Sequence, residues 1–267
     1  MDKSHKIVVF DLDETLGYFT EFGIFCDSLN KYFNNHTYSD DHFSFLLDLY
    51  PEFLRPKLIN ILKYLKNKKI ENKCYKIMIY TNNQGPKSWA IQIKNYFNSK
   101  IEYSLFDQII AAFKVRGTPV ELGRTSHDKS VDDFIRCTKI PKDIEICFID
   151  DVYHPGMIDD KVYYINVKAY KHSLPFDYMI QKYLKSELGS KLSNKEDFIT
   201  KMEHEMNRYN YVVNNKSKQE QEIDKIVGKK IIQHLKHFFN ENIYKTHKRV
   251  QSYKKKIRNK TLKKSSH

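Results

Sequence analysis

The sequence predicts an α/β protein with a doubly wound, Rossmann-like parallel sheet, and three observations support this prediction. Short apolar runs of strand length alternate with longer segments whose apolar residues recur at helical spacing. Three of the short runs end in polar or acidic residues. The chain of 267 residues is long enough for one well-buried domain with an appended segment. Since strands that alternate with helices run parallel, we expect the three polar ends at one edge of the sheet.

The first predicted strand covers residues 7–10, which read Ile-Val-Val-Phe. Four consecutive apolar β-forming residues without helical spacing fit a strand that is buried on both faces. Asp11 and Asp13 follow it, and alternation along an extended chain directs both carboxylates to the same side. Neighbouring anions repel, so the pair requires a cation or a shared proton. The alternative is an exposed turn, where aspartate is also common.

Residues 17–50 are rich in aromatic side chains and have no clear periodicity. At about 34 residues, this segment is too short to form an independent domain with its own core. We predict a hairpin flap over the end of the first strand, followed by a short helix. Residues 17–55 are assigned to this small insert.

The remaining elements of the α/β domain follow in order. The later strands are predicted at residues 77–80, 106–112, 144–149 and 162–167, and the helices are predicted to begin at Arg55-Pro56, Pro86, Ser130 and Phe176. The helix after Pro86 has its apolar residues at positions 89, 93, 96 and 97, and this stripe indicates core packing.

Beyond Gly189, the alternation of strands and helices stops. Ser193 with Glu196, and Ser217 with Glu220, each have the spacing of a capping box ahead of an apolar helical stripe. We expect two helices that pack on each other or on the sheet. The predicted organisation is therefore an α/β domain at 1–188, a helical extension at 189–244 and a basic, disordered tail at 245–267.

The net charge of +13 is concentrated at the C-terminus. From Lys245 onward the chain has ten Lys or Arg residues and no acidic residue, which leaves 36 basic and 33 acidic residues before it. Such a tail serves solubility or contacts nucleic acid non-specifically. The sequence shows no signal segment, no run of membrane-spanning length and no paired cysteine spacing. We expect a soluble intracellular protein of the cytoplasm or nucleus, without a membrane partner.

Several motifs occur in an order that resembles the haloacid dehalogenase superfamily of phosphatases. They are Asp11-x-Asp13-x-Thr15, Thr81 after the second strand, Lys129, and Asp150-Asp151 after the fourth strand. The resemblance covers about residues 7–167. It implies that Asp11 is the nucleophile and Asp13 an acid/base, with Mg²⁺ between them and a late acidic motif.

The chemistry of phosphoryl transfer fits these residue types. A phosphoryl group repels an attacking carboxylate unless a metal and a cation neutralise the site, and Mg²⁺ and Lys129 would do so. Mg²⁺ prefers octahedral oxygen coordination, which Asp11, Asp13 through its carbonyl, and Asp150 would supply, with Asp151 orienting a water ligand. Asp11 would form an aspartyl-phosphate, and Asp13 would protonate the leaving alcohol.

Other residues are expected to contact the substrate. Thr81 offers a hydroxyl and an amide to the phosphate oxygens, and Thr15 and Asn82 lie beside the motif residues in the sequence. Arg116 and Arg124 flank a glycine-containing loop and are candidates for binding an additional anionic group. His154 follows Asp151 and is either a substrate contact or a surface residue.

Two lysines compete for the role of the site cation. We favour Lys129, because the 21 residues from it to Asp150 fit one helix and a turn before the last motif strand. Lys114 is the alternative.

The substrate is indicated by two different similarities. The Asp11–Leu16 motif, Arg55-Pro56 and the run Phe148–Asp151 are similar to nuclear-LIM-interactor-interacting-factor-like and RNA polymerase C-terminal-domain phosphatases, which implies a phosphoserine or phosphothreonine protein. The absence of a large lid fits such a substrate. The loop Thr81-Asn-Asn-Gln-Gly85 is more similar to polynucleotide 3'-phosphatases and histidinol-phosphatases. With the basic tail, this makes a nucleic-acid 3'-phosphate the alternative substrate.

Two further interpretations remain open. A non-catalytic binding or scaffold protein on the same fold is one of them, since fold alone does not determine function. The sequence also resembles superfamily members of large DNA viruses, in which case the compartment would be that of a host cell.

Overall fold

The computed structural model describes residues 6–34, 40–141, 143–210, 213 and 215–241 of the chain. Its main sheet has five parallel strands in the order β3-β2-β1-β6-β7. These strands are β1 (Lys6–Phe10), β2 (Lys76–Tyr80), β3 (Gln108–Ile110), β6 (Glu145–Asp150) and β7 (Val162–Asn166), and a separate antiparallel ribbon consists of β4 (Lys114–Val115) and β5 (Thr118–Pro119). The predicted parallel α/β architecture is confirmed.

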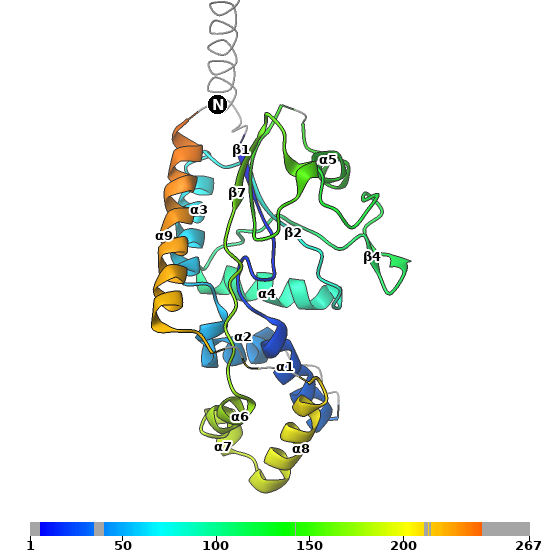
Figure 1. Cartoon of the computed structure of the whole chain (residues 1–267), viewed down its shortest axis with the longest axis vertical. Helices are drawn as coiled ribbons and strands as arrows, with labels where there is room; N and C mark the ends of the chain where they lie inside the picture. Colours follow the sequence, from blue (N-terminus) through cyan, green and yellow to red (C-terminus); the bar gives the residue numbers. More distant parts are fainter. Residues whose placement is uncertain (1–5, 35–39, 142, 211–212, 214, 242–267) are drawn as a thin grey trace, which may run out of the picture.

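Helices cover both faces of this sheet. They are α1 (Thr20–Tyr32), α2 (Asp40–Leu49), α3 (Leu58–Ile70), α4 (Lys87–Lys100), α5 (Val131–Thr138), α6 (Phe176–Leu184), α7 (Glu187–Ser190), α8 (Lys195–Asn207) and α9 (Lys218–Asn240), with 3₁₀ turns at Pro51–Phe53 and Pro155–Met157. In Figure 1, α3 and α9 lie side by side on one side of the sheet, and α5 lies on the other.

The central strands bury both of their faces, as their continuous apolar sequences predict. In β1, Val8 and Phe10 belong to the larger core cluster, whereas Ile7 and Val9 belong to the smaller cluster under α5. Successive side chains of a strand point to opposite faces, so every residue of such a strand must be apolar. The third predicted strand, 106–112, is shorter in the structure, because only Gln108–Ile110 pairs with β2. Phe106 is buried outside this ladder.

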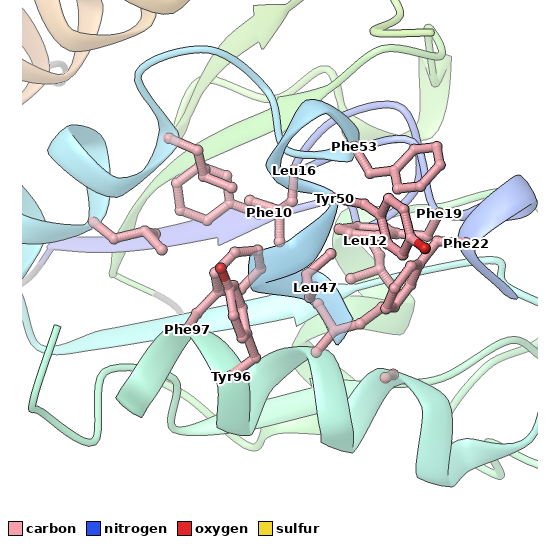
Figure 2. Packing of buried hydrophobic residues seen from close by; sticks show 14 of the residues in the cluster. Phe10, Leu12, Leu16, Phe19, Phe22, Leu47, Tyr50, Phe53, Tyr96 and Phe97 are labelled. Atoms are coloured by element: carbon pink, nitrogen blue, oxygen red, sulfur yellow. The ribbon is translucent and has the colours of Figure 1, made fainter. Parts of the chain in front are cut away.

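The prediction of a hairpin flap at residues 17–55 is wrong. This segment contains α1 and α2, and the apolar residues of α1 recur at helical spacing and are buried. In Figure 2, the Phe53 ring packs against the rings of Phe22 and Tyr50, and its centroid lies 5.8 Å from that of Phe22 and 6.2 Å from that of Tyr50. Aromatic residues have only moderate helix propensity, so tertiary packing rather than local preference makes α1 a helix.

The C-terminal helices pack on the α/β domain rather than on each other. Helix α8 contacts α1 and α6, and α9 contacts α3 and β7 (Figure 1). A Cβ atom at Gly228 of α9 would lie 2.2 Å from the Pro56 carbonyl oxygen, so glycine permits this close approach. The division into 1–188 and 189–244 remains a prediction, and the basic tail at 245–267 lies outside the described residues.

Helix caps test the two predicted capping boxes. Ser217 forms the expected box with Glu220 at the start of α9. Ser193 does not cap α8, because Asn194 is the N-cap and its side chain accepts from the Asp197 amide at 3.0 Å. Within the described part of the chain, none of the helices is both long and apolar enough to cross a bilayer.

Candidate active site

Asp11 follows β1 directly and Asp150 ends the adjacent strand β6, and Lys129 lies between their carboxylates. Lys129 Nζ is 2.6 Å from Asp11 Oδ1 and 2.6 Å from Asp150 Oδ2. Asp151 completes a group of three carboxylates whose potential ligand oxygens all lie within 4.8 Å of one another. The strand order reverses between β1 and β6, which is where open α/β sheets bind ligands. The fold thus brings together four of the predicted site residues.

A buried arginine holds the turn after β1 in place. Arg55 is 2 % exposed, and its Nε and Nη2 atoms donate to the carbonyls of Thr15 and Glu14 at 2.5 and 2.6 Å. Glu14 has a left-handed φ of 59°, which such contacts help to maintain. The turn presents Thr15 to the cluster, and the Thr15 hydroxyl donates to Asp151 Oδ1 at 2.9 Å. Arg55 therefore positions the first motif, whereas the sequence indicated it only as a helix start and through a family resemblance.

The loop after β2 contacts Asp13. The Thr81 hydroxyl accepts a hydrogen bond from the Asn83 amide at 3.0 Å, and Asn83 Nδ2 donates to Asp13 Oδ2 at 2.7 Å. The Gly85 amide donates to Asn83 Oδ1 at 2.7 Å and fixes the orientation of this side chain. Asp13 is thus oriented toward the β2 loop, and its carboxylate is not one of the three in the cluster. Asn83 is a site residue that the sequence analysis did not select, although it lies in the loop quoted there.

Lys129 is enclosed by aromatic rings as well as by carboxylates. Its side chain is 1 % exposed, and Nζ lies 5.5 Å from the Tyr80 ring centroid and 5.8 Å from that of Phe148. Both rings lie at cation–π distance from this nitrogen. The competing candidate, Lys114, lies in β4 with its Nζ 4.9 Å from the Phe113 ring centroid. The contacts of Lys129 with Asp11 and Asp150 therefore favour it as the site cation.

The two predicted substrate arginines have different environments. Arg124 is 3 % exposed and donates to the carbonyls of Thr81, Ala111 and His127 at 3.2, 3.0 and 2.9 Å. These hydrogen bonds connect the end of β2 to the segment before Lys129, which indicates a positioning role. Arg116 is exposed in the turn between β4 and β5, and a substrate contact there stays a prediction.

Asn82 and His154 lie close to the predicted motifs. Asn82 is half-buried, and its Oδ1 has no hydrogen-bond partner among the described residues, so it remains a candidate substrate contact. His154 is buried rather than a surface residue, and its Nε2 lies 3.5 Å from Asp150 Oδ2. The sequence could not distinguish these environments, because they depend on how the loops after β2 and β6 fold back.

Burial shifts the proton affinities of the acidic residues. It raises the pKa of Asp11, Asp13 and Asp151 above their ordinary values, against the effect of neighbouring donors such as Lys129 and Asn83. Burial acts in the same direction on Asp150, but the contacts with His154 and Lys129 prevail and lower its pKa. The cluster is therefore a place where negative charge is in excess and poorly solvated.

The residues of the cluster fit a divalent cation. Lys129 pairs with two of the three carboxylates, so the group carries excess negative charge when all three are ionised. Their hard oxygen donors belong to the class that Mg²⁺ prefers. Comparisons of this chain with protein-family models, with curated proteins and with solved structures find no match.

Proposed function

We propose that the chain is a Mg²⁺-dependent phosphomonoesterase that works through an aspartyl-phosphate. The observation that supports this best is the pairing of Lys129 with both Asp11 and Asp150 in a buried cluster that also contains Asp151. A carboxylate can attack a phosphate only where the negative charge of both is neutralised. The cluster combines a candidate nucleophile with a buried cation and a set of candidate metal ligands.

The chain's own residues have distinct roles in this proposal. Asp11 attacks phosphorus, and an Asp11–phosphorus bond forms as the ester bond to the leaving oxygen breaks. Asp13, oriented by Asn83, gives a proton to the leaving oxygen. In the second step, water attacks phosphorus while Asp13 takes its proton, and phosphate leaves Asp11. Lys129 stabilises the charge on the transferred group.

Asp11, Asp150 and Asp151 would hold Mg²⁺, together with the Asp13 carbonyl that the sequence suggested. When bound, Mg²⁺ supplies further neutralisation of the phosphate oxygens. Thr15 contributes by orienting Asp151, to which its hydroxyl donates. Thr81 and Asn82, at the end of β2, are the proposed phosphate contacts.

The sequence suggested a phosphoserine or phosphothreonine protein as the substrate. The alternative, a polynucleotide 3'-phosphate, was suggested by the loop at residues 81–85 together with the basic tail, and the tail lies outside the described residues. A scaffold protein without activity is the third alternative. A single assay separates it from the two enzymatic alternatives.

The test is phosphate release from p-nitrophenyl phosphate with Mg²⁺ and after chelation. We expect Mg²⁺-dependent release that is abolished in Asp11→Asn. The matched control is Asp128→Asn, which removes an exposed carboxylate next to Lys129 in the sequence. Full activity in Asp11→Asn, or no release from any phosphomonoester by the folded protein, would overturn the proposal.

A further inference from the structure

A cavity of about 710 Å³ opens beside Asp13, away from the carboxylate cluster. Its walls come from α1, α2, the loop after β2 and the start of α4, and its lining includes Asp13 and Asn83. In the proposed reaction Asp13 gives its proton to the leaving oxygen. The part of the substrate attached to that oxygen must therefore lie on the Asp13 side of the phosphorus, where this cavity is.

The cavity has an aromatic wall. Phe19, Phe43 and Trp89 line it, and the Trp89 ring packs edge-on against Phe43 with a centroid separation of 5.5 Å. Trp89 is half-buried, so part of its ring remains free to contact a ligand. The exposed part of the Trp89 ring can bind a planar ring by stacking.

Amide side chains provide the polar part of the lining. Asn30, Gln84 and Gln92 line the cavity together with Asn83. Asn30 Oδ1 is buried and has no hydrogen-bond partner among the residues that the structure describes. Asn and Gln amides match the donor and acceptor edges of nucleobases.

The charge of the lining argues against a polyanionic ligand. Asp13 and Asp27 are its charged members, and the described lining includes no Lys or Arg. Binding a polynucleotide requires cations along the backbone, and phosphate contacts supply most of its affinity. The lining thus suits a leaving group that is planar, uncharged and able to hydrogen-bond.

We propose that this cavity binds the nucleoside part of a nucleoside monophosphate, whose phosphate lies at the Asp11 cluster. This inference rests on the proposed function and specifies its substrate. Hydrolysis would break the phosphorus–oxygen ester bond and, with one water consumed, release the nucleoside and inorganic phosphate. A phosphopeptide and a 3'-phosphorylated oligonucleotide are the competing substrates.

Trp89 allows a direct binding test, because it is the only tryptophan in the chain. Adenosine, guanosine, cytidine and uridine are titrated into the full-length protein without Mg²⁺ or phosphate, and tryptophan fluorescence is recorded. We expect saturable quenching by at least one nucleoside, and no saturable quenching by ribose. Absence of quenching by all four nucleosides would overturn the inference.

Gly23 of α1 provides a matched pair of variants. A Cβ atom there would lie 3.6 Å and 3.7 Å from two Trp89 ring atoms, which is ordinary van der Waals contact. Gly23→Leu places a larger side chain in the cavity, so we expect nucleoside binding at least about 10-fold weaker. Gly23→Ala should weaken it less, and thermal unfolding checks that both variants fold. Equal binding by Gly23→Leu and the unmodified protein would contradict the inference.

Hydrolysis then tests the substrate class. We expect kcat/KM for the preferred nucleoside monophosphate to exceed that for glycerol phosphate by about 10- to 100-fold, and Trp89→Leu to reduce this ratio. A higher kcat/KM for a phosphoserine peptide or a 3'-phosphorylated oligonucleotide would overturn the inference and leave the phosphatase proposal standing. Nucleoside binding without hydrolysis of any phosphomonoester would support the nucleoside site and overturn the phosphatase proposal.

Discussion

Lys129 and Asp150 are 21 residues apart in the sequence, and their charged atoms lie 2.6 Å apart with both side chains 1 % exposed. Removing one member of an ion pair that is buried so deeply lowers the free energy of unfolding strongly. Removing one partner leaves an uncompensated charge, which typically costs about 3–5 kcal/mol. The pair therefore connects the stability of the fold to the chemistry of the site.

We expect Lys129→Met to lower the free energy of unfolding by about 3–5 kcal/mol and to abolish phosphate release. Lys114→Met is the matched control, because that side chain contacts only an aromatic ring in the described structure, and it should cost less than about 1 kcal/mol. Urea unfolding without Mg²⁺ and the p-nitrophenyl phosphate assay measure the two effects. If both variants lose similar amounts of unfolding free energy and of phosphate release, Lys129 is not distinguished from Lys114 as the site cation.

Arg124 and Arg116 should respond differently to replacement by alanine. Arg124→Ala leaves three carbonyls without their donor, so we expect a loss of about 2–4 kcal/mol in unfolding free energy and a lower kcat. Arg116→Ala should leave the unfolding free energy within about 0.5 kcal/mol, because the residue is exposed in a turn. If Arg116 contacts the substrate, its loss raises KM alone. A stable Arg124→Ala protein with unchanged kcat would contradict the positioning role.

Added Mg²⁺ should stabilise the folded protein, since the cluster exists only in the folded chain. At a concentration 100 times its Kd, the expected gain is about 2.7 kcal/mol in unfolding free energy, measured as a rise in Tm at fixed ionic strength. Asp151→Asn removes one ligand and should reduce the gain, whereas Asp128→Asn should keep it. An equal rise in Tm with K⁺ would indicate a non-specific salt effect instead.

Glu21 is expected to make stability depend on pH. It is 0 % exposed, and burial raises its pKa from 4.5 to about 7, although the Leu174 amide donates to it at 2.8 Å. The folded state binds the Glu21 proton more tightly than the unfolded chain does. The contribution of protonated Glu21 to the free energy of unfolding is therefore fully present below about pH 4.5. It is lost as the pH rises through about 7.

Glu21→Gln should therefore be more stable than the unmodified protein at pH 8, by at most about 3 kcal/mol, and similar to it near pH 4.5. Urea unfolding across this pH range measures the difference. The control is Glu71→Gln, which changes an exposed carboxylate. A difference between Glu21→Gln and the unmodified protein that does not grow with pH would show that the Glu21 proton is not bound more tightly in the folded state.

Replacing the N-cap residues of α8 and α9 tests the observed caps, including the one at Asn194 that the sequence had placed at Ser193. Ser217→Ala and Asn194→Ala each remove a side-chain cap and should cost about 1 kcal/mol. Ser193→Ala should cost almost nothing, although its spacing to Glu196 predicted a capping box. Thermal unfolding of the three variants gives the comparison. A larger loss in Ser193→Ala than in Asn194→Ala would contradict the observed cap.

The sequence predicted the sheet well and the insert poorly, for a physical reason. Strands buried on both faces need continuous apolar runs, so β1, β2, β6 and β7 were found within one residue of their observed bounds. The described part of residues 17–55 forms no strand of the main sheet, so it does not need a continuous apolar run. In α1, Phe22 packs against Trp89 and Phe25 packs against Tyr183, and local propensity does not encode these partners outside the segment.

For the candidate site, the sequence by itself determined which residue types stand at the strand ends, because a buried strand must stop where its polar residues begin. It selected Asp11, Thr81 and Asp150 on that basis, and Lys129 by its spacing of 21 residues from Asp150. Only the tertiary structure decided that Lys129 pairs with two of these acids, that Asn83 orients Asp13 and that Arg124 is committed to three carbonyls. Those contacts join segments of the chain that are far apart in the sequence. They depend on how the loops fold over the sheet edge, and no local pattern of residues specifies that path.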